Sequence, residues 1–131
     1  PFEEKEEVLS SAKKYEVDII SLIAPTSEDR IQMIAKEAEG YIYVVSSMGV
    51  TGVRSEITTD IEAIVKVIRE VTDTPIAVGF GISTTEQAEK YGKMADGIIV
   101  GSAIVKIIEK YGEKAGKYVY EYVKGMVEAV K

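Results

Sequence analysis

Three glycine-bearing segments contain the residues best suited to chemistry. GVTG at 49–52, GFGIS at 79–83 and GSA at 101–103 each follow or end an apolar run. Glycine lets the main chain approach a ligand closely, and free amide hydrogens at the start of a helix attract anions. The three segments together predict a phosphate site whose donors are mainly backbone amides.

Each segment alone also has a simpler explanation. GFGIS is typical of a strand-to-helix turn that needs positive φ, Ser102 of a helix cap, and GVTG of an inert surface loop. Their joint occurrence favours the phosphate site, because (β/α)₈ barrels often bind phosphate with the loops after their last two strands. We expect the segments to meet at one edge of a sheet.

Acid-base chemistry has few candidate residues. The chain has no His and no Cys, which excludes an imidazole base, a thiolate and a His-liganded metal centre. Asp18 and Asp96 precede predicted strands, at the edge of a parallel sheet associated with stability, and Asp60 is explained as a helix cap. Arg54 and Glu56 follow no apolar strand closely enough to be held rigidly. The sequence therefore predicts a binding site without proton-transfer groups.

Aromatic residues accompany the glycines. Phe80 lies between two glycines at the end of a predicted strand, which suggests a wall for a flat apolar group beside the phosphate, and Met48 and Ile82 are expected to enlarge that wall. Tyr43 lies within a predicted strand, where its simpler role is core packing.

Strands and helices must alternate to position these segments. The order predicts a parallel sheet with right-handed crossovers, either an open, flavodoxin-like doubly wound sheet or part of a (β/α)₈ barrel of about 250 residues. The near-continuous apolar run at 17–24 predicts a strand covered on both faces. Caps are expected from Thr26 or Ser27, from Thr59 with Glu62, and from Ser83 with Glu86. The predicted elements are helix 3–15, strand 17–24, a helix from about 27 to 39, strand 41–45, a helix from about 59 to 71, strand 75–80, helix 83–93, strand 97–101, helix 102–110 and a last helix that buries Val123 and Val130.

Composition excludes several classes of protein. The 131 residues carry a net charge of -6 without a basic stripe, so no nucleic-acid partner is expected. The longest apolar run, 97–108, is broken by Lys106 and is shorter than the roughly 20 residues that span a membrane. We expect a single cytoplasmic domain. The first residues, PFEEKEEVL, lack an initiator Met, which is compatible with a start inside a longer gene product.

Four stretches carry a family resemblance: LIAPTSEDRI (22–31), YVVSSMGVTGVR (43–54), PIAVGFGIST (75–84) and ADGIIVGSAIVKIIE (95–109). In this order and spacing they resemble the C-terminal half of the tryptophan synthase α chain over nearly the whole length of the sequence. The resemblance implies an α/β fold: the C-terminal half of a (β/α)₈ TIM barrel, with about four parallel βα units and a terminal helix. It also implies a lyase of tryptophan biosynthesis that cleaves indole-3-glycerol phosphate to indole and glyceraldehyde 3-phosphate.

The resemblance assigns roles to individual positions. The family's catalytic Glu and Asp belong to the first half of the barrel, and neither is present here, so this chain would hold no catalytic residue and no metal. Ser47 stands where many relatives carry Arg, which puts the contacts of that Arg in doubt. Residues implied at the substrate phosphate are Gly52, Gly81, Ile82, Gly101 and Ser102, and those implied at the indole and reacting end are Tyr43, Thr51 and Phe80.

Partners follow from the same resemblance. No cofactor is implied in this chain, because pyridoxal phosphate belongs to the partner β chain. Unpaired sheet edges and an open apolar face predict association with an N-terminal half barrel or with a second copy. Alone, the chain is expected to bind but not to catalyse. The alternatives are another phosphosugar barrel, such as one like indole-glycerol-phosphate synthase, and a non-catalytic half-barrel scaffold.

Overall fold

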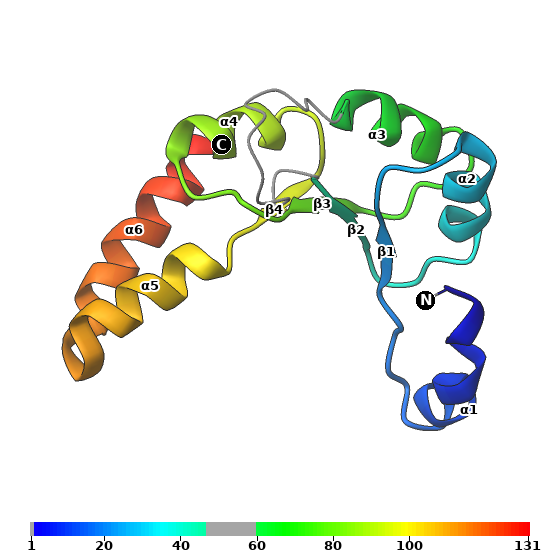
Figure 1. Ribbon diagram of the computed structural model, residues 1–131, viewed down its shortest axis with the longest axis horizontal. Coiled ribbons are helices and arrows are strands. Elements are labelled where there is room, and N and C mark those ends of the chain that lie inside the picture. The colour runs from blue at the N-terminus through cyan, green and yellow to red at the C-terminus, as the bar shows by residue number, and fades with distance from the viewer. Residues whose placement is uncertain (1, 47–59) are drawn as a thin grey trace.

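A computed structural model of the chain describes residues 2–46 and 60–131 (Figure 1). The described residues form one sheet of parallel strands whose spatial order is their order in the sequence. Short apolar runs rich in Ile and Val form these strands, as their β propensity predicts. The strands are β1 (Ser21–Ile23), β2 (Ile42–Val45), β3 (Ile76–Gly79) and β4 (Gly97–Ile99).

Helices cover one face of this sheet. Figure 1 shows α2, α3 and α4 along that face, whereas α1 and the α5–α6 pair extend from the two ends toward the other side, so that the molecule has the outline of an arch. An open doubly wound sheet would carry helices on both faces, so the structure supports the half barrel. The helices are η1 (Phe2–Glu4), α1 (Glu6–Lys14), α2 (Glu28–Lys36), α3 (Ile61–Arg69), α4 (Thr85–Gly92), α5 (Ser102–Tyr111), η2 (Gly112–Lys114) and α6 (Ala115–Ala129).

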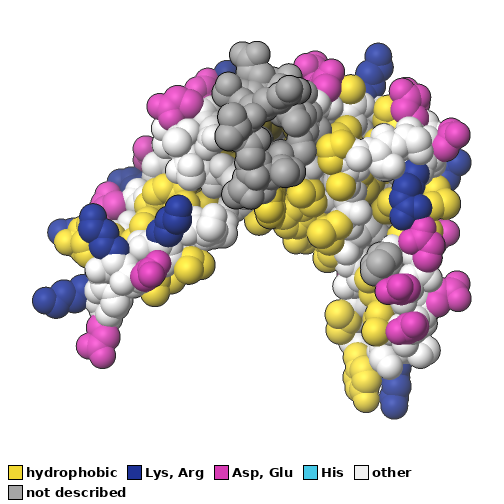
Figure 2. Space-filling model, viewed as in Figure 1, with side chains coloured by type: hydrophobic (Ala, Val, Ile, Leu, Met, Phe, Trp, Pro, Cys, Tyr) yellow, Lys and Arg dark blue, Asp and Glu magenta, His cyan; other side chains and the backbone are white. Residues whose placement is uncertain are grey.

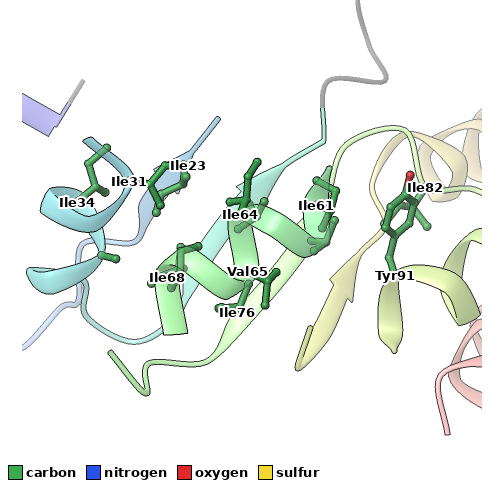
Figure 3. Close-up of a cluster of buried hydrophobic side chains, with 14 of the residues drawn as sticks. Ile23, Ile31, Ile34, Ile61, Ile64, Val65, Ile68, Ile76, Ile82 and Tyr91 are labelled. Carbon is green, nitrogen blue, oxygen red and sulfur yellow. The ribbon is translucent and has the colours of Figure 1, made fainter. Parts of the chain in front are cut away.

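The core lies between the sheet and these helices (Figure 3). Alternate residues of β2 and β3 point toward the helices, and the apolar stripe of α3 packs against them. Each fully buried aliphatic side chain stabilises the fold by roughly 1.5–3 kcal/mol relative to its exposed state. Buried core residues include Ile23, Ile31, Ile34, Ile42, Val44, Ile61, Ile64, Ile68, Ile76 and Val78.

The opposite, inner face of the sheet is open. The strand register aligns Leu22, Tyr43, Ala77 and Gly97 in one row on this face. The expectation that the strand at 17–24 is covered on both faces is wrong, because Leu22 is 61% exposed. No described element packs over the inner face, and Figure 2 shows hydrophobic side chains gathered on the inner side of the arch.

Three helix starts test the predicted caps. Asp60 caps α3 as predicted, because its Oδ1 accepts a hydrogen bond from the amide of Ala63 at 3.0 Å. Ser27 precedes α2 without a side-chain cap bond. The cap of α4 is Thr84 rather than Ser83, because Thr84 and Gln87 form a reciprocal capping box.

The last helix buries less than its pattern predicts. Within α6, Ala115 and Met126 are buried, whereas Val123 is exposed. Val130, which follows the last residue of α6, is also exposed, although the pattern predicted burial of both valines. The helix packs on α5 and α4 along one side only. None of the helices within residues 2–46 and 60–131 is long and apolar enough to cross a membrane.

Candidate functional site

The carboxyl ends of β3 and β4 lead into two of the glycine segments. Gly79 pairs with Ile99 in the parallel register, so Gly81 and Gly101 each lie two residues beyond a matched pair. Carboxyl ends of neighbouring parallel strands meet at one edge of a sheet. The two segments therefore leave the sheet at the same edge and at the same distance along their strands.

The turn after β3 has an unusual backbone. Phe80 has φ of 81° and Gly81 has φ of 77°. Glycine adopts this left-handed region readily, whereas a residue with a Cβ is strained there by about 1–3 kcal/mol. The prediction of a positive-φ turn is confirmed at Gly81. The strained backbone of Phe80, a residue that is 51% exposed at this edge, was not predicted.

Ser46, directly after β2, fastens this turn to the neighbouring strand. Its Oγ donates toward the carbonyl oxygens of Phe80 at 2.6 Å and Gly79 at 3.0 Å. Its amide also donates to the Gly79 carbonyl at 3.0 Å. Sequence reasoning missed this residue, although a polar side chain ending the apolar run YIYVV was a signal for it.

The far side of the turn is held by α4 and α6. Gln87 Oε1 accepts from the amides of Ser83 at 2.9 Å and Thr84 at 3.2 Å. The Tyr122 hydroxyl donates to the Ser83 carbonyl at 2.7 Å, and burial raises the pKa of Tyr122, which keeps this donor protonated. The turn is thus preorganised from both sides.

Ile82 contributes its side chain to the core. It is 2% exposed and lies beside Tyr91 of α4 (Figure 3). The expectation that its side chain enlarges an apolar wall is therefore wrong. The backbone of Ile82 is the part that remains for a ligand at the edge.

Tyr43 reaches along the inner face toward the same edge. A Cβ built on Gly79 would lie 2.5 Å from Tyr43 Cζ and 2.7 Å from Cε1, so the ring crosses directly over this glycine. Tyr43 pairs with Ala77 in the register, and its ring therefore extends toward the carboxyl end of β3. Tyr43 is not part of the core between sheet and helices; its ring packs over Gly79 on the open inner face.

Gly101 and Ser102 open helix α5. Gly101 has φ of -119°, and a Cβ there would meet nothing within 4 Å, so the fold itself does not require glycine at this position. Gly101 is the cap residue and Ser102 is the first helical residue, so the simple explanation of Ser102 as the cap is wrong. The open space at Gly101 is what a closely approaching ligand would need.

The amino edge of the sheet carries a structural carboxylate, as predicted. Asp96 Oδ2 accepts from the Ile76 amide at 2.8 Å and pairs with Arg69, which also donates to the Thr74 carbonyl at 2.8 Å. The Ile76 amide, and then the Arg69 guanidinium, hold the pKa of Asp96 below its ordinary value. This group ties α3, β3 and the start of β4 together, away from the glycine segments.

Other features lie elsewhere in the described part of the chain. A surface hollow along α6 is lined by apolar side chains, among them Val119, Val123 and Val127, and by charged ones. Another hollow, between α3 and α4, is lined by acidic and basic side chains and Met94. No group of three or more acidic side chains among the described residues is arranged to hold a metal ion. Several candidates from the sequence lie outside the described residues, namely Ser47, Met48, Thr51, Gly52, Arg54, Glu56 and Thr59.

Comparison with known proteins identifies the family. The sequence model of the family described as "Tryptophan synthase alpha chain" matches residues 1–131. The chain belongs to the tryptophan synthase alpha chain family. The tryptophan synthase alpha chain of Lacticaseibacillus casei is 47% identical over 130 residues, and that of Thermoanaerobacter sp. (strain X514) is 45% identical over 131. These matches include 99% and 100% of this chain, and 49% of each relative.

Solved structures agree with this family. The tryptophan synthase subunit alpha of Campylobacter jejuni superposes with a TM-score of 0.74 at 32% identity over 99% of this chain and 49% of that one. A chain of the tryptophan synthase α2β2 complex of Pyrococcus furiosus superposes with a TM-score of 0.80 at 30% identity over 98% of this chain and 52% of its own. The chain thus spans about half the length of the tryptophan synthase alpha chains that it matches.

Proposed function

We propose that this chain supplies the phosphate site and part of the indole pocket of a tryptophan synthase alpha barrel. The intact barrel would cleave indole-3-glycerol phosphate to indole and glyceraldehyde 3-phosphate. One observation supports the proposal most directly. Gly79 and Ile99 are partners in the register of β3 and β4, and Gly81 and Gly101 each lie two residues beyond them. That arrangement brings two sets of backbone amides to one edge of the sheet.

The chemistry at this edge is anion binding. The amides of the Gly81 turn, and the first amides of α5 with the Ser102 hydroxyl, would donate to the phosphate oxygens, and the partial positive charge of the α5 N-terminus would favour the dianion. Open space at Gly101 supports this role, because an oxygen ligand needs room beside the main chain. Gly52, and the backbone of Ile82, would complete the set of donors.

The apolar part of the substrate would lie beside the phosphate. The exposed ring of Phe80 would form one wall of an indole pocket, because flat apolar groups pack well on aromatic rings. Tyr43, whose ring extends along the inner face toward this edge, would contact the reacting end together with Thr51. Closure of the protein around this site would exclude water and strengthen the polar contacts.

Proton transfer would come from residues outside this chain. We infer that a Glu and an Asp of an N-terminal half barrel provide it, and that this chain alone binds substrate without cleaving it. The bonds of Asp96 support this inference. Its carboxylate accepts a hydrogen bond from the Ile76 amide and pairs with Arg69 at the opposite edge of the sheet, so it is not placed for proton transfer at the glycine segments. A β chain carrying pyridoxal phosphate would then receive indole from the completed barrel.

Phosphate binding by the chain tests the proposal directly. Titration of the ¹⁵N-labelled chain with glycerol 3-phosphate should shift the amide signals of Gly81, Gly101 and Ser102 together. Gly101→Ala should weaken binding several-fold while changing stability by less than about 1 kcal/mol, because its methyl group enters open space in the folded chain.

Gly116→Ala is the matched control, since Gly116 also faces open space but lies on α6. It should leave binding unchanged. Two results would count against the proposed site. One is a titration in which the amide signals of Gly81, Gly101 and Ser102 do not shift, and the other is an equal loss of glycerol 3-phosphate affinity in the two variants.

A further inference from the structure

Ser46 is a buried polar residue with an unusual pair of partners. It is 1% exposed, and within the described part of the chain it is the polar side chain that the core encloses. Buried hydroxyls need hydrogen-bond partners, and the single hydroxyl hydrogen of Ser46 is shared between the carbonyls of Gly79 and Phe80, at the end of the neighbouring strand.

The shorter of these bonds acts on a particular peptide group. The carbonyl of Phe80 and the amide hydrogen of Gly81 belong to the same planar, trans peptide unit, in which they point in opposite directions. Ser46 Oγ lies 2.6 Å from the Phe80 oxygen on the buried side. The Gly81 amide of that unit is therefore directed away from Ser46.

The backbone around this peptide would not hold the orientation by itself. Phe80 is strained at φ of 81°, and Gly81, at φ of 77°, can adopt negative φ equally well. Rotation of the peptide plane between them changes ψ of Phe80 and φ of Gly81, which glycine tolerates, and would turn the Gly81 amide inward. A bond from outside the turn is needed to prevent that rotation, and Ser46 makes one.

We propose that Ser46 is a positioning residue for phosphate binding. Its hydroxyl fixes the Phe80–Gly81 peptide so that the Gly81 amide is presented to the anion and the Phe80 ring stays at the substrate edge. The inference rests on the proposed function, since it assigns the phosphate to the Gly81 amide. Ser46 itself does not contact the ligand.

A nearly isosteric pair of variants isolates the hydroxyl. Thr and Val have similar shapes and differ in the hydroxyl group, so Ser46→Thr should keep the turn and Ser46→Val should release it. In the full chain, glycerol 3-phosphate binding should be about tenfold weaker in Ser46→Val than in Ser46→Thr, which corresponds to one hydrogen bond of ordinary net strength. Ser46→Ala, and Ser46→Cys if Ala impairs folding, should resemble Val.

A geometric readout accompanies affinity. The distance between the α hydrogen of Phe80 and the amide hydrogen of Gly81 depends on ψ of Phe80, which rotation of this peptide changes. The nuclear Overhauser effect between these two hydrogens should therefore be the same in the wild-type chain and in Ser46→Thr, and different in Ser46→Val. Thr72→Val is the control for loss of a hydroxyl, because Thr72 bonds Thr74 at 2.8 Å before β3, at the other edge. It should lower stability without changing either readout.

The outcomes separate the two proposals. A wild-type chain that does not bind glycerol 3-phosphate overturns the proposed function, and an unchanged Phe80–Gly81 signal in Ser46→Val then overturns the role of Ser46 as well. Binding that is equal in Ser46→Val and Ser46→Thr overturns the role of Ser46 alone. Tenfold weaker binding together with a changed Phe80–Gly81 signal supports it.

Discussion

At the scale of single residues, the close approach of a tyrosine ring explains why one position is glycine, and a hydrogen bond from the neighbouring strand end explains how a strained phenylalanine is held. Gly79 lies under the ring of Tyr43, whereas Phe80 is kept at positive φ next to the bond from Ser46. Both residues lie where β3 ends. The end of β3 therefore depends on close contacts with β2 and the residue that follows it.

The Gly79–Tyr43 contact gives a prediction at this scale. Gly79→Ala should destabilise the chain by about 1–3 kcal/mol, because its Cβ would overlap the Tyr43 ring. Combining it with Tyr43→Ala should recover most of that loss, whereas Tyr43→Phe should not, since the overlap includes ring carbons. Urea unfolding of the single and double variants measures the coupling, and strictly additive losses would contradict the contact.

At the scale of elements, one carboxylate joins three of them at the amino edge. Asp96 precedes β4, accepts from the first amide of β3 and pairs with Arg69 of α3. Its pKa in the folded chain is lowered from the ordinary value of 3.8. A group with a lowered folded pKa stabilises the fold above its unfolded pKa and loses that effect as the pH falls through the folded pKa.

Asp96→Asn should therefore reduce stability at neutral pH and not in strong acid. We expect a loss of about 1 kcal/mol or less at pH 7, because the pair is partly exposed and screened by solvent. The difference from wild type should shrink as the pH falls below about 4. Glu89→Gln breaks the more exposed pair with Lys93 on α4 and should cost less. Thermal unfolding from pH 7 to 2 measures both, and a gap for Asp96→Asn that is independent of pH would contradict the assignment.

At the scale of the whole molecule, the arch exposes apolar surface that a closed barrel would cover. Leu22 is exposed on the edge strand β1, in the inner-face row of the register, and Val105 and Ile108 are exposed on α5. Exposed apolar patches and free strand edges favour association. We expect this chain to associate with a half barrel or with a second copy through this face.

Leu22→Glu tests the use of the inner face. It should weaken self-association of the chain several-fold, because a charge would be buried on contact. Met33→Glu is the matched control, since Met33 is exposed on α2, among the helices that cover the outer face. Sedimentation over a range of concentrations measures both variants. Association through this face would be excluded if the wild-type chain had the mass of one chain at every concentration. It would also be excluded if the two substitutions changed self-association equally.

The sequence by itself determined the order of strands and helices, the glycine segments and the structural role of Asp96. These depend on periodicity, turn residues and position relative to a strand, which are local properties of the chain. Tertiary structure decided which face of β1 stays open, why Ile82 enters the core, and how Ser46 and Tyr122 hold the turn after β3. The bonds of Ser46 and Tyr122 join residues more than 30 positions apart. Such contacts, like the exposure of one face of a strand, follow from how the elements pack rather than from any local pattern.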